Sequence, residues 1–148
     1  MRLQEQVTEQ LKVAMKAKDS VALESLRAIK SAILSAQTQV GAQDLTSDDE
    51  IKLVQKLVKQ RKDSAEIFRQ QGRNDLAEPE EAQIKIIEQF LPEQLDEESI
   101  AKVVDEIISQ ANAEGMKDMG KVMGMATKAM SGKADGKTIS AIVRQKLA

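Results

Sequence analysis

Apolar residues recur every three to four positions along most of this 148-residue chain, with polar residues between them. Such spacing places the apolar side chains on one face of an α-helix, whereas no segment alternates as a half-buried β-strand does. Interruptions of the pattern predict seven helices, at about residues 2–16, 20–39, 48–71, 74–90, 97–113, 119–131 and 136–147. We therefore expect an all-α fold.

One apolar stripe on each helix is expected to form the core. In the first helix the stripe advances in steps of four residues, from Leu3 through Val7 and Leu11 to Met15. Other predicted core residues include Leu26, Ile29, Ile33, Leu34, Val54, Val58, Ile87, Val104, Ile107, Ile139, Ile142, Val143 and Leu147.

Short polar side chains mark several helix starts. Asp19 or Ser20 is expected to cap the second helix. Ser47, with Glu50 three residues later, has the spacing of a capping box at the start of the third helix. The aspartates expected to cap the last three helices are Asp96, Asp118 and Asp135. The glycines expected to end the second, third and fifth helices are Gly41, Gly72 and Gly115.

The helical pattern breaks at residues 91–95, which include Pro92. Proline disfavours the helical conformation in the residue before it, so the fourth helix is expected to end here. We place a domain boundary at this break. The prediction is an N-terminal domain of about four helices, residues 1–93, and a small C-terminal three-helix domain, residues 94–148.

The composition narrows the chemistry. The chain has no cysteine, no histidine and only two aromatic residues. Zinc and haem sites and Ser-His-Asp catalysis are therefore excluded, no carboxylate pair predicts an active site, and no metal or cofactor is expected. The scarcity of aromatic rings argues against stacking on single-stranded bases. With a polar start and no apolar run near ~20 residues, we expect a cytoplasmic protein that does not enter a membrane.

Charge is divided unevenly along the chain. Residues 1–114 carry 15 basic and 22 acidic residues, whereas residues 115–148 carry seven basic and two acidic ones. A positively charged segment suits a polyanion. The predicted nucleic-acid-binding residues are Lys117, Lys121, Lys128, Lys133, Lys137, Arg144 and Lys146. The basic side of the third helix is a weaker second patch, because Asp63 and Glu66 interrupt it.

Five of the seven glycines lie in the same C-terminal segment. Gly120 and Gly124 are four residues apart on the expected sixth helix, where each costs about 1 kcal/mol relative to alanine. Close packing against another helix is the favoured explanation, and close approach of an RNA backbone is the alternative. The glycines expected to permit such an approach are Gly120, Gly124, Gly132 and Gly136.

Two further features of this segment have alternative interpretations. The GKADGKT stretch at residues 132–138 is similar to a P-loop, but it has three residues between its glycines and follows a helix, so a turn is favoured. The helix start after this turn, with Lys137, could still accept a phosphate. The methionines are expected in the core, with a groove for a partner helix as the alternative: Met116, Met119, Met123, Met125 and Met130.

Residues 118–137, DMGKVMGMATKAMSGKADGK, followed by ISAIV, resemble the signature of the GatB/YqeY family. LRAIKSAI at 26–33, GRNDL at 72–76 and FLPEQL at 90–95 match its YqeY branch, although Phe90 stands where that branch usually has tyrosine. The resemblance covers essentially the whole chain. It implies an all-helical protein similar to the tail of the B subunit of glutamyl/aspartyl-tRNA amidotransferase.

The resemblance also implies a function. In that amidotransferase the tail contacts tRNA, while glutamine hydrolysis and ATP-dependent activation belong to parts that this chain lacks. The implied function is an accessory protein that binds tRNA or another structured RNA and has no catalytic centre of its own. Two alternatives remain. One is a protein-interaction module for an aminoacyl-tRNA synthetase or an amidotransferase subunit, and the other is carbon–nitrogen ligase activity with glutamine as amido-N-donor.

Overall fold

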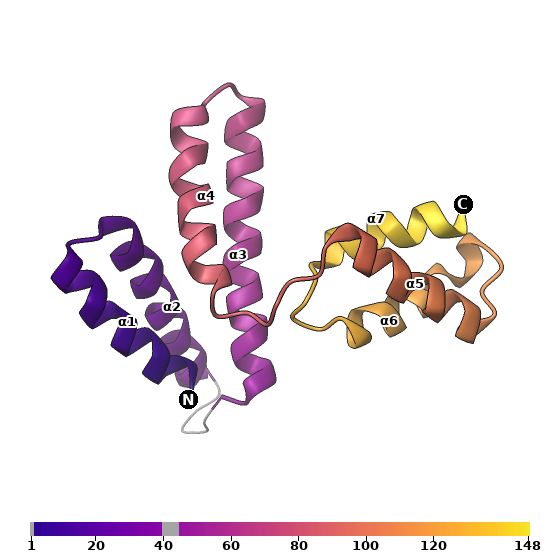
Figure 1. Ribbon diagram of the computed structural model, residues 1–148, viewed down its shortest axis with the longest axis horizontal. Helices are drawn as coiled ribbons and strands as arrows, with labels where there is room; N and C mark the ends of the chain where they lie inside the picture. Colours follow the sequence, from indigo (N-terminus) through magenta and orange to yellow (C-terminus); the bar gives the residue numbers. More distant parts are fainter. Residues whose placement is uncertain (1, 40–44) are drawn as a thin grey trace. The chain divides into compact units, whose positions relative to one another are not determined.

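The computed structural model describes residues 2–39 and 45–148, which form seven α-helices and one short 3₁₀ helix (Figure 1). These elements are α1 (Leu3–Ala17), α2 (Ser20–Gln39), α3 (Ser47–Gln70), α4 (Asn74–Glu88), α5 (Glu97–Ala111), η1 (Met116–Asp118), α6 (Met119–Ala129) and α7 (Gly136–Leu147). The described residues include no strand, so the predicted all-α fold class is confirmed.

The chain divides into two compact units, which we call the N-terminal unit (Met1–Leu91) and the C-terminal unit (Pro92–Ala148). The N-terminal unit contains α1 to α4, and the C-terminal unit contains α5 to α7. The two domains expected from the sequence, residues 1–93 and 94–148, stay a prediction.

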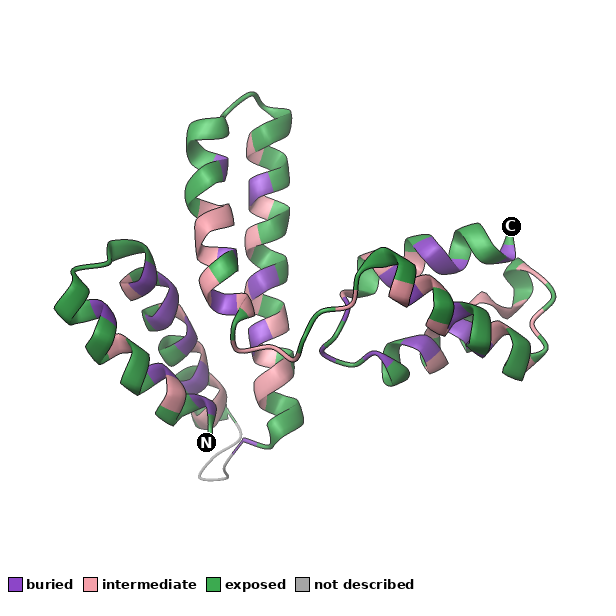
Figure 2. Cartoon of the chain, in the orientation of Figure 1, coloured by how far each residue is buried: buried purple, intermediate pink, exposed green. Residues whose placement is uncertain are grey.

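Two helix pairs build the N-terminal unit. α1 packs along α2, α3 packs along α4, and α2 also contacts both α3 and α4. The most buried side chains of the shared core are at most 1% exposed and include Val7, Leu26, Ile29, Val54 and Ile87. Figure 2 shows the buried residues along the facing sides of these helices. The periodic apolar stripes therefore explain the packing.

Two predicted core residues are exposed, Met15 at 60% and Leu34 at 49%. Each step of four residues rotates a stripe by about 40° beyond a full turn, so three steps from Leu3 place Met15 about 120° away. Ala14 faces the core instead. Leu34 lies about 100° around α2 from the buried Ile33, outside the side that packs.

Thr46, rather than Ser47, caps α3. Thr46 Oγ1 accepts a hydrogen bond from the Asp49 N–H at 3.1 Å, and the Asp49 carboxylate accepts from the Thr46 N–H at 3.0 Å. The predicted capping box was therefore wrong by one residue. The Thr46 N–H holds the pKa of the Asp49 carboxyl below its usual range. Glu50 accepts instead from the Leu3 N–H of α1, at 3.0 Å.

Three predicted caps are confirmed. Asp19 accepts from the Ala22 N–H at 3.1 Å at the start of α2. Asp96 and Asp135 each accept at 2.7 Å from the N–H three residues later, at the starts of α5 and α7. Gly72 follows α3 with a left-handed φ of 74°, as a helix-ending glycine does. Gly41, predicted to end the second helix, lies outside the described residues.

Two predicted helix ends in the C-terminal unit were wrong. Asn112 ends α5 with a left-handed φ of 50°, three residues before Gly115, because asparagine tolerates that conformation. Asp118 makes no side-chain cap for α6 and accepts instead from the Glu114 N–H at 2.9 Å. The 3₁₀ helix η1 separates the connecting loop from α6 and accounts for this change.

The C-terminal unit is a three-helix bundle in which α5, α6 and α7 all pack on one another. Its core is aliphatic, and the residues that are at most 1% exposed include Val104, Val122, Ala126, Ile139 and Val143. All four inward residues predicted for the last helix are buried. The bundle therefore fixes which side of α6 and which side of α7 face solvent.

Candidate nucleic-acid interface

α6 places two glycines and two lysines on its outward side. Val122 and Ala126, which are fully buried, set the inward direction of this helix. At about 100° per residue, five exposed positions lie roughly 120–180° around the axis from that direction: Gly120, Lys121, Gly124, Thr127 and Lys128. We call the two glycines and two lysines among them, Gly120, Lys121, Gly124 and Lys128, the α6 face.

The two glycines of the α6 face border open space. A Cβ placed on Gly120 or Gly124 would meet no atom within 4 Å. The prediction that these glycines permit close helix packing inside the C-terminal unit was therefore wrong. Each still costs about 1 kcal/mol of helix propensity relative to alanine. What remains is a strip of bare helix backbone bordered by Lys121 and Lys128.

The two lysines of the α6 face are also free of intramolecular partners. Within residues 2–39 and 45–148, neither Lys121 nor Lys128 makes an ion pair or side-chain hydrogen bond, and Lys133 and Arg144 share this property. Two other predicted cations are paired. Lys117 contacts Glu114 at 3.3 Å and Lys146 contacts Asp105 at 3.2 Å.

The seven predicted cations do not share one helix side. Lys117 lies in η1, before α6 begins, so it is not on the same helix as Lys121 and Lys128. Lys137 and Arg144 are seven residues apart on one side of α7. Because all three helices of the bundle pack on one another, the outward sides of α6 and α7 point in different directions. The structure thus forms two short rows of cations.

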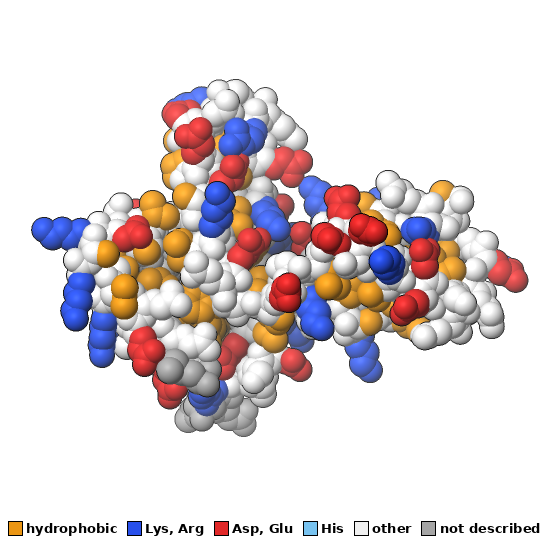
Figure 3. Space-filling model, viewed as in Figure 1, with side chains coloured by type: hydrophobic (Ala, Val, Ile, Leu, Met, Phe, Trp, Pro, Cys, Tyr) orange, Lys and Arg blue, Asp and Glu red, His pale blue; other side chains and the backbone are white. Residues whose placement is uncertain are grey.

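The C-terminal unit is not positive as a whole. The predicted charge division falls at residue 114, but α5 carries acidic residues and belongs to the same unit as α6 and α7. Residues 92–148 contain nine acidic and eight basic residues. Figure 3 shows acidic and basic side chains mixed on the visible side of this unit. Any preference for a polyanion must therefore come from local rows rather than from net charge.

The start of α7 already holds a carboxylate. Asp135 accepts from the Thr138 N–H at 2.7 Å, so a phosphate at this helix start would meet a negative group. Gly132 is buried with a left-handed φ of 78°, and its carbonyl accepts from Gln94 Nε2 at 2.7 Å. The GKADGKT stretch is thus a turn after a helix, as predicted, and Gly132 serves the turn.

The methionines fill the core of the C-terminal unit. Met130 is 1% exposed, and Met119, Met123 and Met125 are partly buried against the same cluster. Only Met116 of this predicted set is largely exposed, at 49%. The core interpretation is therefore confirmed for Met130, and Met119, Met123 and Met125 pack partly buried against the same core.

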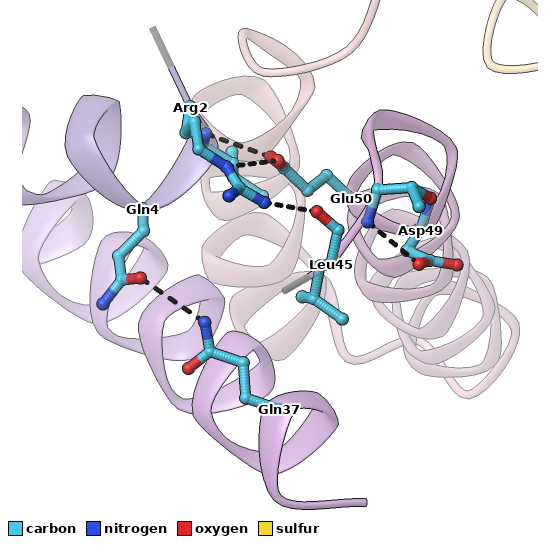
Figure 4. Close-up of polar contacts among 8 residues, drawn as sticks. Arg2, Gln4, Gln37, Leu45, Asp49 and Glu50 are labelled. Carbon is cyan, nitrogen blue, oxygen red and sulfur yellow. Dashed lines mark hydrogen bonds and ion pairs between the residues drawn. The ribbon is translucent and has the colours of Figure 1, made fainter. Parts of the chain in front are cut away.

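A polar cluster in the N-terminal unit joins the starts of α1 and α3 (Figure 4). Arg2 forms an ion pair with Glu50 at 3.8 Å and donates to the Leu45 carbonyl. Gln37 Nε2 donates to Gln4 Oε1 at 3.5 Å and links α2 to α1. Sequence reasoning missed this cluster, because it assigned Glu50 to a cap. Its polar groups bind one another, which indicates a structural role.

Within the described ranges, no group of three or more acidic side chains is placed to hold a metal ion. None of the described helices has the length and apolar character needed to cross a membrane.

The described residues thus form a small all-helical protein with a three-helix C-terminal unit. The chain belongs to the YqeY-like protein family, whose model matches residues 4–147. This finding confirms the family resemblance read from the sequence motifs.

Two kinds of relative are similar to this chain. "Altered inheritance of mitochondria protein 41, mitochondrial" of Pyrenophora tritici-repentis is 33% identical over 127 residues, which are 84% of this chain and 68% of that protein. The E subunit of glutamyl-tRNA(Gln) amidotransferase from Thermococcus gammatolerans is 31% identical over 105 residues. That match covers 68% of this chain but 17% of the archaeal protein. The similarity to the amidotransferase therefore concerns a small part of it.

Proposed function

We propose that this chain is an accessory protein that binds tRNA or another structured RNA through the α6 face. The observation that carries the proposal is the pairing of two bare glycines with two lysines that have no intramolecular partner among the described residues. Lys121 and Lys128 supply positive charge for phosphates, and the missing side chains let a polyanion approach the helix closely. The helix carries the cost of two glycines without any packing gain inside its own unit.

Structured RNA fits this surface better than single-stranded RNA. The chain has two aromatic residues, Phe68 and Phe90, and both lie in the N-terminal unit. Single-strand binders stack bases on exposed rings, whereas duplex RNA is recognised mainly by shape and by phosphate and 2′-OH contacts. The name of the archaeal relative refers to a tRNA-dependent reaction, which supports tRNA as the first ligand to test.

Lys137 and Arg144, which form the row on α7, and Lys133 remain predicted RNA contacts and extend this proposal. Lys117 and Lys146 contact carboxylates and would contribute less. The amidotransferase relative also supports binding to an amidotransferase subunit, whereas binding to a synthetase stays a prediction. The methionines that would line a partner groove pack against the core of their own unit. Carbon–nitrogen ligase activity stays an alternative prediction, for which the described residues supply no catalytic group that we can name. The cytoplasmic location stays a prediction, and the relative from Pyrenophora tritici-repentis is named mitochondrial.

The test is a filter-binding titration of purified tRNA at several salt concentrations. The variant Lys121→Glu/Lys128→Glu is compared with the parent and with Lys12→Glu/Lys16→Glu, which changes the net charge equally on α1. Each lost phosphate contact makes the log–log salt slope shallower by about 0.7–0.9. We expect the α6 variant to lose affinity at least about tenfold and to show a slope shallower by about 1.4–1.8.

The control variant should bind as the parent does, apart from a small uniform loss from its changed net charge. If both variants weaken binding equally, only overall charge matters and the α6 face is not the interface. If the parent does not bind tRNA or other structured RNA at low salt, the proposed function is wrong.

A further inference from the structure

α3 carries another row of cations, formed by Lys52, Lys56 and Lys59, which we call the α3 row. Their spacing of four and then three residues places them on one side of the helix. This side lies opposite the buried Val54 and Val58, and all three lysines are exposed. The row is about 10 Å long, from the helix rise of 1.5 Å per residue. One strand of a nucleic-acid duplex presents about three phosphates over that length.

The cations in the C-terminal part of α3 have side-chain partners. Arg61 Nε donates to Gln83 Oε1 at 2.8 Å, and Lys62 contacts Glu88 at 3.6 Å. Arg69 forms an ion pair with Glu81. These partners all lie on α4. The cations that flank the α3–α4 contact therefore hold the two helices together.

The α3 row has no such partner in the described part of the chain, in ion pairs or in side-chain hydrogen bonds. Lys52 and Lys56, and then Lys56 and Lys59, are like charges one helical turn apart, an arrangement that weakens a helix. The nearest acidic residues along the helix are Glu50 and Asp63, and Glu50 accepts from the Leu3 N–H of α1. Asp49 lies one turn before Lys52, and the two side chains attract each other without forming an ion pair. The chain thus keeps three neighbouring positive charges that no described carboxylate holds in an ion pair.

We propose that the α3 row is a second contact for the phosphate backbone of the same RNA that the α6 face binds. This inference rests on the proposed function. The α3 row lies in the N-terminal unit and the α6 face in the C-terminal unit. One RNA that binds to both is held at two points. The second contact then forms at the high effective concentration set by the chain that joins the two units, which raises affinity beyond that of either row alone.

A polyphosphate suits the row better than an anionic membrane. Helices that lie on membranes insert an apolar side next to their basic side. The apolar side of α3 is buried against α2 and α4, and Val54 and Val58 are at most 5% exposed. The exposed residues next to the row are polar, such as Gln60 and Asp63. Ile67, which is 52% exposed, lies about two helical turns beyond Lys59 on the same side of α3. The row itself therefore offers charge without an adjacent apolar side chain that could enter lipid.

The test uses the full-length chain with Lys52→Glu/Lys56→Glu/Lys59→Glu. Its control is Lys12→Glu/Lys16→Glu/Lys30→Glu, which has the same net charge and alters exposed lysines of α1 and α2. Affinity for purified tRNA is measured across salt concentrations, and circular dichroism checks the fold. We expect the α3 variant to bind at least about tenfold more weakly than the control, with a salt slope shallower by about 2–3.

A neutral variant, Lys52→Gln/Lys56→Gln/Lys59→Gln, protects the test against a fold defect from three new carboxylates. It should also lose affinity relative to the parent. If the α3 variants bind as tightly as the control while the α6 variant loses binding, this inference is wrong and the proposed function stands. If the parent binds no RNA, both fail. Binding of the parent to phosphatidylserine vesicles as tightly as to tRNA, with loss in the α3 variant, would assign the row to a membrane and overturn the inference.

Discussion

The α3–α4 pair and α6 use charged residues in opposite ways. In the α3–α4 pair, Arg61, Lys62 and Arg69 each contact a side chain of the partner helix. On α6, Lys121 and Lys128 form no ion pair or side-chain hydrogen bond with the described residues and stand beside glycines that border open space. The first arrangement serves the fold, whereas the second leaves charge and backbone available. The comparison indicates that candidate binding residues are better chosen by whether each basic side chain has a partner than by the number of basic residues.

The largest expected effect separates the inward side of α6 from its outward side. Val122 is fully buried, and Val122→Asp places a carboxylate in the aliphatic core of the C-terminal unit. We expect this change to lower the free energy of unfolding by about 3–5 kcal/mol, measured by urea denaturation. Lys128→Asp, on the outward side, should cost only about 1 kcal/mol, because it places a negative charge in the last turn of α6 but buries nothing. Similar losses in both variants would contradict the assigned orientation of α6.

A smaller effect is expected from filling the glycine positions. Gly120→Ala and Gly124→Ala should each raise the free energy of unfolding by about 1 kcal/mol, because alanine favours the helix and no neighbouring atom obstructs its Cβ. Thermal or urea unfolding measures the change. A loss of stability in either variant would mean that the α6 face packs against another part of the chain, as the sequence pattern first suggested.

The smallest effect concerns acid. Hydrogen bonding from the Ser99 N–H lowers the pKa of the Asp96 carboxyl in the folded chain. A carboxyl whose pKa is depressed by folding adds stability above its unfolded pKa of about 3.9, and this stability disappears as the pH falls through the folded pKa. Asp96→Asn keeps a capping oxygen but does not titrate. Its stability should fall less than that of the parent between about pH 5 and pH 3, as urea midpoints at several pH values will show.

The helices and most of the core could be predicted because they depend on local periodicity. The errors arose where two neighbouring residues suit the same role. Thr46 and Ser47 both precede an acidic residue by three positions, and the contact of Glu50 with Leu3 of α1 decides between them. Asn112 and Gly115 are likewise both able to end a helix. Which residue caps or ends a helix depends here on contacts between residues far apart in the sequence, and the local spacing of residues does not reveal them.

The candidate site was harder to predict than the fold. A pair of glycines four residues apart looks the same in sequence whether it packs against a helix or faces solvent. The orientation of α6 follows from Val122 and Ala126, which become buried only when all three helices assemble. The seven cations were correctly seen as a cluster in sequence, but the bundle directs them to different sides. Their role in RNA binding stays a prediction.

The most direct test of the central claim fills the bare strip of the α6 face without changing its charge. Gly120→Leu/Gly124→Leu adds two side chains where no atom lies within 4 Å, and Ser31→Leu on the exposed side of α2 serves as the control. In a tRNA-binding titration at low salt, we expect the α6 variant to bind at least about tenfold more weakly than the control while being at least as stable as the parent. A stable α6 variant that binds tRNA as tightly as the parent would contradict the claim that RNA approaches this helix.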